Sequence, residues 1–204
     1  HDGTIDNTIV AHEWGHYIHH RLVNTGSNQG RSQSEGWGDF IAAHMASRAG
    51  DNFATGTFAM AIYSTVSFYD EGYYGIRRLP YTRDMVKNPF TFKHIADENP
   101  LPAIPLGSGG ATNSEVHNAG EVWTAMLWDA YTALILSGKY SFDMAKRKMA
   151  DYMVGGMIMA PTDATFNEQR DGILAYVASV DNEDMVLMAN EFARRGLGTC
   201  SISP

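Results

Sequence analysis

The sequence has little of three features that would each define a class of protein. It contains one cysteine in 204 residues, Cys200, so it can form no internal disulfide and no cysteine-based zinc cluster. Acidic residues outnumber basic ones, and a formal net charge of -8 without a basic stripe argues against nucleic acid as a partner. No apolar segment is long enough to cross a bilayer, since the most apolar one, residues 124–136, is short and contains Asp129. We therefore expect neither nucleic acid nor a membrane as a partner.

Composition and length predict one folded, mainly α domain over residues 1–204. Hydrophobic residues make up 44% and charged residues 19%, which is typical of a globular chain rather than a disordered one. A chain of this length can bury one good core. Few stretches alternate with period two, so helices dominate the prediction. We expect them over residues 5–23, 35–47, 53–69, 115–136, 141–158, 165–180 and 181–196, with an irregular segment over 70–105 and a Gly/Ser loop over 106–114.

Local patterns support several of these bounds. Thr165 and Glu168 form a capping-box pattern that opens one helix, and Asp181 is placed to cap the next. Residues 26–34 are rich in glycine and polar side chains, so we expect them to form the turn between the first two helices. Gly15 weakens the first helix by roughly 1 kcal/mol, which suggests that another segment packs closely against it.

The clearest chemical motif is His-Glu-Trp-Gly-His at residues 12–16. Residues four apart on a helix lie one turn apart on the same face, so His12 and His16 point in the same direction. Their imidazole nitrogens and the carboxylate of Glu35 would give a zinc ion three protein ligands and leave the fourth position open for water. Glu13, beside that open position, is placed to take a proton from the water.

Glu35 and Asp39 form the second part of the predicted site. Eighteen residues lie between His16 and Glu35, enough for one helix to end, a loop to turn and a second helix to bring Glu35 to the metal. Asp39 follows one turn later on the same face as Glu35. A metal-bound histidine usually donates its other N–H to a carboxylate. We therefore expect Asp39 to be the partner of His12.

A further histidine completes the predicted chemistry. His117 follows the Gly/Ser-rich stretch and stands at the start of a predicted helix, where it can face a cleft. Peptide hydrolysis passes through a tetrahedral intermediate whose oxyanion needs a donor besides the zinc. His117 is our candidate for that donor. The other histidines are interpreted as structural or solvated, although one of them lies one turn beyond His16; they are His19, His20, His44 and His94.

Together these motifs resemble those of thermolysin-type metallopeptidases, and more closely those of the fungalysin family. The matching blocks run in order through nearly the whole chain, at residues 2–3, 12–16, 35–39, 80–84, 88–89, 116–123 and 192–198. The resemblance implies a secreted, extracellular zinc endopeptidase that is made with a propeptide and has a two-lobed catalytic unit. This chain would be the helical C-terminal lobe, with the active-site helix at its N-terminus.

The resemblance also implies roles for individual residues. It implies that His12, His16 and Glu35 bind one catalytic zinc ion. It also implies that Glu13 is the base and proton shuttle and that His117 is the oxyanion donor. Arg77 resembles the arginine that such enzymes use near the substrate carbonyl, although Arg78 could equally be the one. No tyrosine lies between residues 24 and 35 to act as a second oxyanion donor, so that role is vacant or filled by a residue such as Tyr81.

The chain has no initiator Met and no signal peptide, and its catalytic helix begins almost at once. We therefore expect a fragment or a processed chain whose upstream part is missing, so the lack of a targeting signal carries no weight. The expected partners are protein or peptide substrates and the upstream lobe of the same precursor. Calcium is also possible, but no motif indicates where it would bind.

Two alternatives to an endopeptidase are compatible with the sequence. Zinc aminopeptidases also use His-Glu-x-x-His followed by Glu at this spacing, and their distinguishing signature would lie upstream of this sequence. The block at residues 35–39 and the segment around His117 favour the endopeptidase. A zinc-binding but inactive scaffold is the other alternative. Glu13 argues against it, because a structural site needs no base and usually closes its fourth position.

Overall fold

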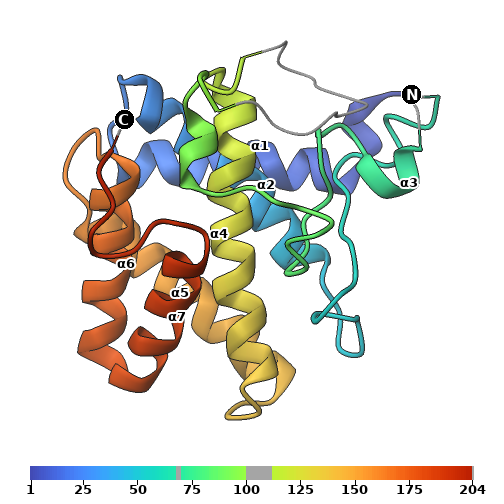
Figure 1. The fold of residues 1–204 in the computed structure, drawn as a ribbon. Helices are drawn as coiled ribbons and strands as arrows, with labels where there is room; N and C mark the ends of the chain where they lie inside the picture. Colours follow the sequence, from blue (N-terminus) through green and yellow to red (C-terminus); the bar gives the residue numbers. More distant parts are fainter. Residues whose placement is uncertain (68–69, 100–111, 204) are drawn as a thin grey trace.

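The computed structural model describes residues 1–67, 70–99 and 112–203, and the regular elements in these ranges are all helices (Figure 1). In these ranges the β-type pairing consists of two isolated bridges and no β-strand is formed, so the prediction of a mainly α fold is confirmed. In chain order the elements are η1 (Gly3–Ile5), α1 (Asn7–Leu22), α2 (Asn28–Ala46), α3 (Glu71–Tyr74), η2 (Phe92–Ile95), α4 (Val116–Leu136), α5 (Phe142–Met159), α6 (Phe166–Val180) and α7 (Asn182–Arg194).

Helix α4 is mainly apolar and lies at the centre of the fold. Its residues 118–134 are buried on every side, and the charged ones among them, Glu121 and Asp129, pair with buried arginines. Figure 1 shows α5, α6 and α7 gathered along one side of α4, while α1 and α2 lie near its N-terminal end. Large side chains fill the space between these helices, and those that are fully buried include Trp37, Trp123, Trp128, Tyr131, Phe166 and Phe192.

Glycines allow α1, α2 and α4 to approach more closely than larger residues would. A Cβ atom on Gly15 of α1 would lie 2.6 Å from the Cα atom of Gly38 on α2. On the other side of α2, a Cβ atom on Gly36 would lie 2.6 Å from the carbonyl oxygen of Gly120 on α4. The expectation of close packing at Gly15 is therefore confirmed, and α2 is held between two helices at the level of Glu35.

Most predicted helices are confirmed to within two residues. Thr165 caps α6 in a capping box with Glu168, and Asp181 caps α7. The segment predicted to be irregular contains the short helices α3 and η2. Its last residues, 100–105, the first part of the predicted Gly/Ser loop, 106–111, and residues 68–69 lie outside the described residues.

The prediction of a helix over residues 53–69 is wrong for the part that the structure describes. Residues 53–67 form turns that are tied to the following segment by single bridges, one of them between Phe58 and Tyr81. The ring centroid of Phe58 lies 4.5 Å from that of Trp128, so this apolar segment packs sideways onto α4. Its apolar composition reflects burial against a neighbouring helix, which periodicity alone cannot distinguish from helix formation.

The second helix begins earlier than predicted. Helix α2 starts at Asn28, so residues 28–34, which were expected to belong to a turn, form its first two turns. The Ser27 side chain caps this end by accepting a hydrogen bond of 3.0 Å from the Gly30 N–H. Several polar side chains in these turns are buried against other segments rather than solvated. The polar composition of residues 28–34 therefore reflects contacts with specific partners rather than a solvated loop.

A buried ion pair ties the irregular segment to the helices. Arg195 is fully buried, and its Nε atom lies 2.7 Å from an oxygen of Asp129 on α4. Its remaining N–H groups donate to the backbone carbonyls of Thr82, Asn88 and Phe90 at 2.7–2.9 Å. This network holds the segment after α3 against α4.

In the described part of the chain, no helix combines the length and apolar character that crossing a bilayer requires.

We predict that Gly15→Ala destabilises the protein by about 1–3 kcal/mol, the usual range for overpacking, because the new methyl group would meet the backbone of α2. Gly72→Ala is the matched control, since a Cβ atom there meets nothing within 4 Å. Urea denaturation of both variants and the parent protein measures the difference. Equal stability of the two variants would contradict the close approach of α1 and α2.

Candidate metal centre

Helices α1 and α2 bring three potential metal ligands together. His12 and His16 lie one turn apart on α1, and Glu35 faces them from α2; their ligand atoms all lie within 4.8 Å of one another. The Nε2 atoms of His12 and His16 lie 3.3 and 3.5 Å from the carboxylate oxygens of Glu35. Tetrahedral ligands at zinc distances lie about 3.3–3.4 Å apart. The three side chains therefore have the separation that a bound metal ion requires.

The environment and the protonation state of Glu35 are also compatible with a bound cation. Its Oε2 atom is buried and accepts no hydrogen bond from the described residues, although His12 Nε2 and the Arg77 guanidinium lie 3.3 and 3.8 Å from it. A buried carboxylate oxygen without a donor is unfavourable unless a cation satisfies it. Burial acts to raise the pKa of the Glu35 carboxyl, but the surrounding histidines, His12 foremost, hold it below its ordinary value. Glu35 is therefore ionised, which is the form that binds a metal.

Asp39 fixes the first histidine. Its Oδ1 atom lies 2.7 Å from Nδ1 of His12, which leaves Nε2 directed at Glu35. Burial alone would raise the pKa of the Asp39 carboxyl, but the Arg77 guanidinium and His12 hold it well below its usual range. Burial lowers the pKa of His12, whereas its contacts with Asp39 and Glu35 outweigh burial and raise it to about 9. A metal ion on Nε2 would take the place of a proton.

The structure separates the two candidate arginines. Arg77 donates from Nε and Nη2 to the two oxygens of Asp39 at 2.7 and 2.8 Å, and it borders the pocket beside the proposed ligands. Arg78 is also buried, but it faces α4, where its Nε atom lies 2.7 Å from a carboxylate oxygen of Glu121. Of the two, Arg77 is the one that faces the site.

Tyr81 does not face the pocket, so the suggestion that it could act as an oxyanion donor is wrong. Its side chain is buried, and its hydroxyl donates to Asp39. Burial raises the pKa of this hydroxyl well above its ordinary value, so it stays protonated and remains a donor. Tyr81 thus belongs to the group that holds Asp39, together with Arg77 and His12.

His117 approaches the proposed ligands from the start of α4. Its Nε2 atom is 3.4 Å from Glu35 Oε1, and its Nδ1 atom is 2.7 Å from a carboxylate oxygen of Glu115. Glu115 also caps α4 by accepting from the backbone N–H groups of residues 117 and 118. Glu13 is exposed on α1 and borders the same pocket as His117. The structure therefore brings together all the site residues that the sequence indicates.

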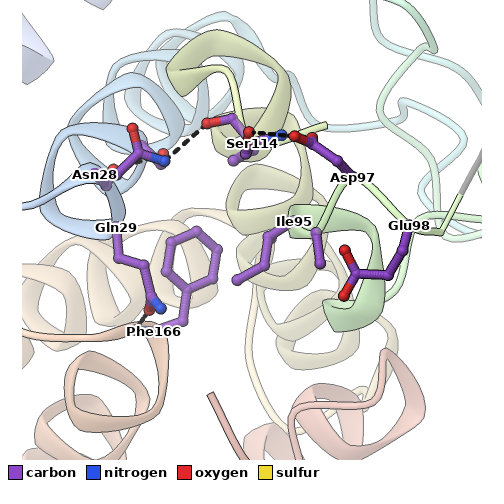
Figure 2. A pocket seen from close by; sticks show the side chains of 10 residues that line it. Asn28, Gln29, Ile95, Asp97, Glu98, Ser114 and Phe166 are labelled. Atoms are coloured by element: carbon purple, nitrogen blue, oxygen red, sulfur yellow. Dashed lines mark hydrogen bonds between the residues drawn. The ribbon is translucent and has the colours of Figure 1, made fainter. Parts of the chain in front are cut away.

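A hydrogen-bonded segment positions the start of α4. The Asn28 side chain on α2 donates to the Ser114 carbonyl at 2.8 Å, and the Ser114 N–H donates to Asp97 at 2.8 Å. Figure 2 shows these bonds at the edge of a cavity of 410 Å³, with Phe166 on its wall. The chain just before Glu115 and His117 is thereby anchored to α2, which also carries Glu35.

Two contacts of the proposed site were not predicted. Ser34 Oγ lies 2.7 Å from Nδ1 of His16, and Glu115 supports His117. Each residue stands within two positions of a predicted site residue. The acidic residue at the start of a helix could have indicated Glu115. A serine beside Glu35 carries no comparable pattern.

A pocket of 210 Å³ adjoins the proposed ligands. Apolar side chains form one wall, and polar groups of the site form another; the lining residues are Ile9, His12, Glu13, Asp39, Met60, Ala61, Ile76, Arg77 and His117. A metal centre with an acidic side chain beside it, opening into a partly apolar pocket, is the arrangement of a metal-dependent hydrolase with the His-Glu-x-x-His motif. The helical fold and this candidate site together match the pattern expected of metallopeptidases with this motif.

Comparison with known proteins identifies the family. The sequence matches the model of the fungalysin metallopeptidases (M36) over residues 1–201, so the chain belongs to this family and the expected relationship is confirmed. It is 29% identical over 218 residues to "Extracellular metalloproteinase mep" of Aspergillus terreus and 28% identical over 221 residues to "Extracellular metalloproteinase 2" of Arthroderma gypseum. It is 26% identical over 220 residues to "Extracellular metalloproteinase 2" of Trichophyton rubrum. Each match covers 97% of this chain and 31% of the relative, so the chain spans about a third of their length.

We predict that His12→Ala loses stoichiometric metal, whereas His117→Ala keeps it. The reason is that His12 belongs to the group of close ligand atoms and His117 does not. Metal content of purified protein, determined by elemental analysis, distinguishes the variants. Loss of metal in both would make His117 a ligand, and retention in both would remove His12 from the metal centre.

Proposed function

We propose that this chain carries the catalytic centre of a secreted zinc endopeptidase that hydrolyses internal peptide bonds of proteins. The observation that carries the proposal is the placement of Glu13 and His117 around the three-ligand group, at the mouth of a pocket. Ligands on one side and a potential base on the other suit hydrolysis better than a structural site, which would enclose the metal. The names of the relatives include the word extracellular, and this supports the proposal that the protein is secreted.

Under this proposal His12, His16 and Glu35 would hold one zinc ion, which would supply Lewis-acid polarisation and activate a water molecule. Glu13 would accept a proton from the water that attacks the peptide carbonyl carbon, and would return it to the amine released when the C–N bond breaks. His117, held by Glu115, donates a hydrogen bond to the oxyanion that develops on the substrate carbonyl. Arg77 borders the pocket and is placed to orient the substrate, while its bidentate contact keeps Asp39 ionised.

The wall of the pocket supports a preference among substrates. Ile9, Met60 and Ile76 give the space beside the proposed zinc an apolar lining. An apolar side chain next to the cleaved bond would be removed from water there, which favours its binding. A peptide with a charged side chain at that position would leave the charge without a partner on this wall.

We also propose that an upstream lobe covers part of this chain. Val10, Trp14 and Met45 are about half exposed and line a groove of 710 Å³ between α1 and α2. Large apolar side chains gathered on one face mark an interaction surface. The chain spans about a third of the length of its relatives, which leaves room for such a lobe. The lobe would supply the edge strand that aligns a peptide substrate, which is not found among the described residues.

We predict that Glu13→Gln retains zinc but lowers turnover at least about a hundredfold, because general-base catalysis typically contributes that much. Glu183→Gln on α7, where the side chain is 84% exposed, is the matched control and should behave like the parent. Zinc content and peptide hydrolysis are measured on the same preparations. Loss of zinc in Glu13→Gln would make Glu13 a ligand, and unchanged turnover would remove it as the base.

The second test maps cleavage of an unfolded protein by mass spectrometry of the products. We expect internal cuts from the earliest times, with apolar residues next to the cleaved bonds. Stepwise loss of residues from the N-terminus would instead support a zinc aminopeptidase. Absence of any cleavage by zinc-loaded, full-length protein would support an inactive zinc-binding scaffold.

A further inference from the structure

The two histidines of the proposed zinc site are supported by different kinds of groups. His12 contacts the ionised carboxylate of Asp39, which Arg77 and Tyr81 also hold. His16 contacts a neutral hydroxyl instead, since its Nδ1 atom lies 2.7 Å from Ser34 Oγ. A hydroxyl has a proton of its own, so it fixes a neighbour well only when that proton is also placed.

A third histidine lies within hydrogen-bond distance of the same hydroxyl. Ser34 Oγ lies 3.0 Å from Nε2 of His20, which stands one turn beyond His16 on α1. The rings of His16 and His20 are stacked, with centroids 5.9 Å apart and planes inclined by 27°. The serine hydroxyl thus lies between two imidazoles of the same helix, and both rings approach it from α1.

The direction of the hydrogen bonds follows from metal binding. A histidine that binds a metal through Nε2 carries its proton on Nδ1, so His16 donates to Ser34 Oγ. The hydroxyl of Ser34 is then free to donate, and Nε2 of His20 is the acceptor within reach. With a metal ion on Nε2 of His16, the order of donation would therefore be His16, Ser34, His20.

The position of Ser34 on α2 favours this role over a purely local one. Serine hydroxyls inside helices often donate to the carbonyl one turn back. Ser32 on the same helix does so, with its hydroxyl 2.7 Å from the Asn28 carbonyl oxygen. Ser34 is equally buried, but its hydroxyl contacts α1. It also directly precedes Glu35, so the backbone that places the carboxylate ligand places this hydroxyl as well.

We propose that Ser34 is a positioning residue for His16 and that His20 orients the Ser34 hydroxyl. This inference rests on the proposed zinc site and adds two residues to it. Ser34 sets the tautomer and ring orientation of the second ligand, as Asp39 does for the first. A neutral hydroxyl supplies this contact without a second buried carboxylate next to Glu35, where like charges would repel.

The test is the dissociation constant for zinc, measured by competition with a chromogenic chelator on the full-length protein. We expect Ser34→Ala to raise the constant about 10- to 100-fold, the usual effect of losing such a partner. Ser34→Thr keeps a hydroxyl and should stay close to the parent. Ser32→Ala, which removes a buried hydroxyl from the same helix, should leave the constant unchanged.

The role of His20 is tested by a double-mutant cycle. His20→Ala should raise the zinc dissociation constant less than Ser34→Ala does, and it should have no further effect when Ser34 is already alanine. Additive effects would overturn the part assigned to His20. The visible spectrum of cobalt-loaded protein gives a second readout, since a reoriented His16 changes the ligand field in Ser34→Ala but not in Ser32→Ala.

Equal zinc affinity of Ser34→Ala and Ser32→Ala would overturn the proposal for Ser34, as would a loss in Ser34→Thr equal to that in Ser34→Ala. His12→Ala separates this failure from failure of the zinc site itself. If His12→Ala also leaves zinc affinity unchanged, the metal centre is wrong. If His12→Ala abolishes binding while the Ser34 variants do not differ from the control, only the positioning role fails.

Discussion

The arrangement of the site depends on one buried carboxylate, that of Asp39. It stands on α2 and is held by His12 from α1 and by Arg77 and Tyr81 from the irregular segment after α3. A buried charge is tolerated only when opposite charge and hydrogen bonds surround it. Because each partner comes from elsewhere in the chain, satisfying Asp39 fixes α1, α2 and the wall of the pocket relative to one another.

Close helix packing serves the same end. Gly38 faces the ring of His12, where a Cβ atom would lie 2.6 Å from Nδ1, and Gly36 faces α4. Between them Trp37 enters the core beside Trp123, with ring centroids 5.5 Å apart. Residues 35–39 thus combine several roles in one helical turn. Glu35 is the proposed ligand, and Asp39 is the charged partner of His12. Between them, two glycines allow close helix contacts and one tryptophan fills the core. Substitutions in this block would disturb packing and metal binding together.

The grouping of the candidate site residues could be predicted from the sequence, because the motif at residues 12–16 and the block at residues 35–39 have spacings that a helix converts directly into shared faces. The choice between Arg77 and Arg78 could not be predicted, since neighbouring residues point in different directions and only the tertiary fold selects one. Residues 53–67 and the start of α2 were mispredicted for a related reason. Their apolar and polar side chains contact residues on other segments, and the local sequence pattern does not reveal those contacts.

We propose that one zinc ion is bound by two imidazoles from α1 and one carboxylate from α2, with a position left for water. X-ray absorption spectroscopy of zinc-loaded protein at the zinc edge tests it most directly. We predict two imidazole nitrogens together with oxygen ligands at about 2.0–2.2 Å, as expected for such sites. A third imidazole in place of the carboxylate would contradict the assignment of Glu35. A sulfur ligand at about 2.3 Å would place the metal elsewhere, at Cys200.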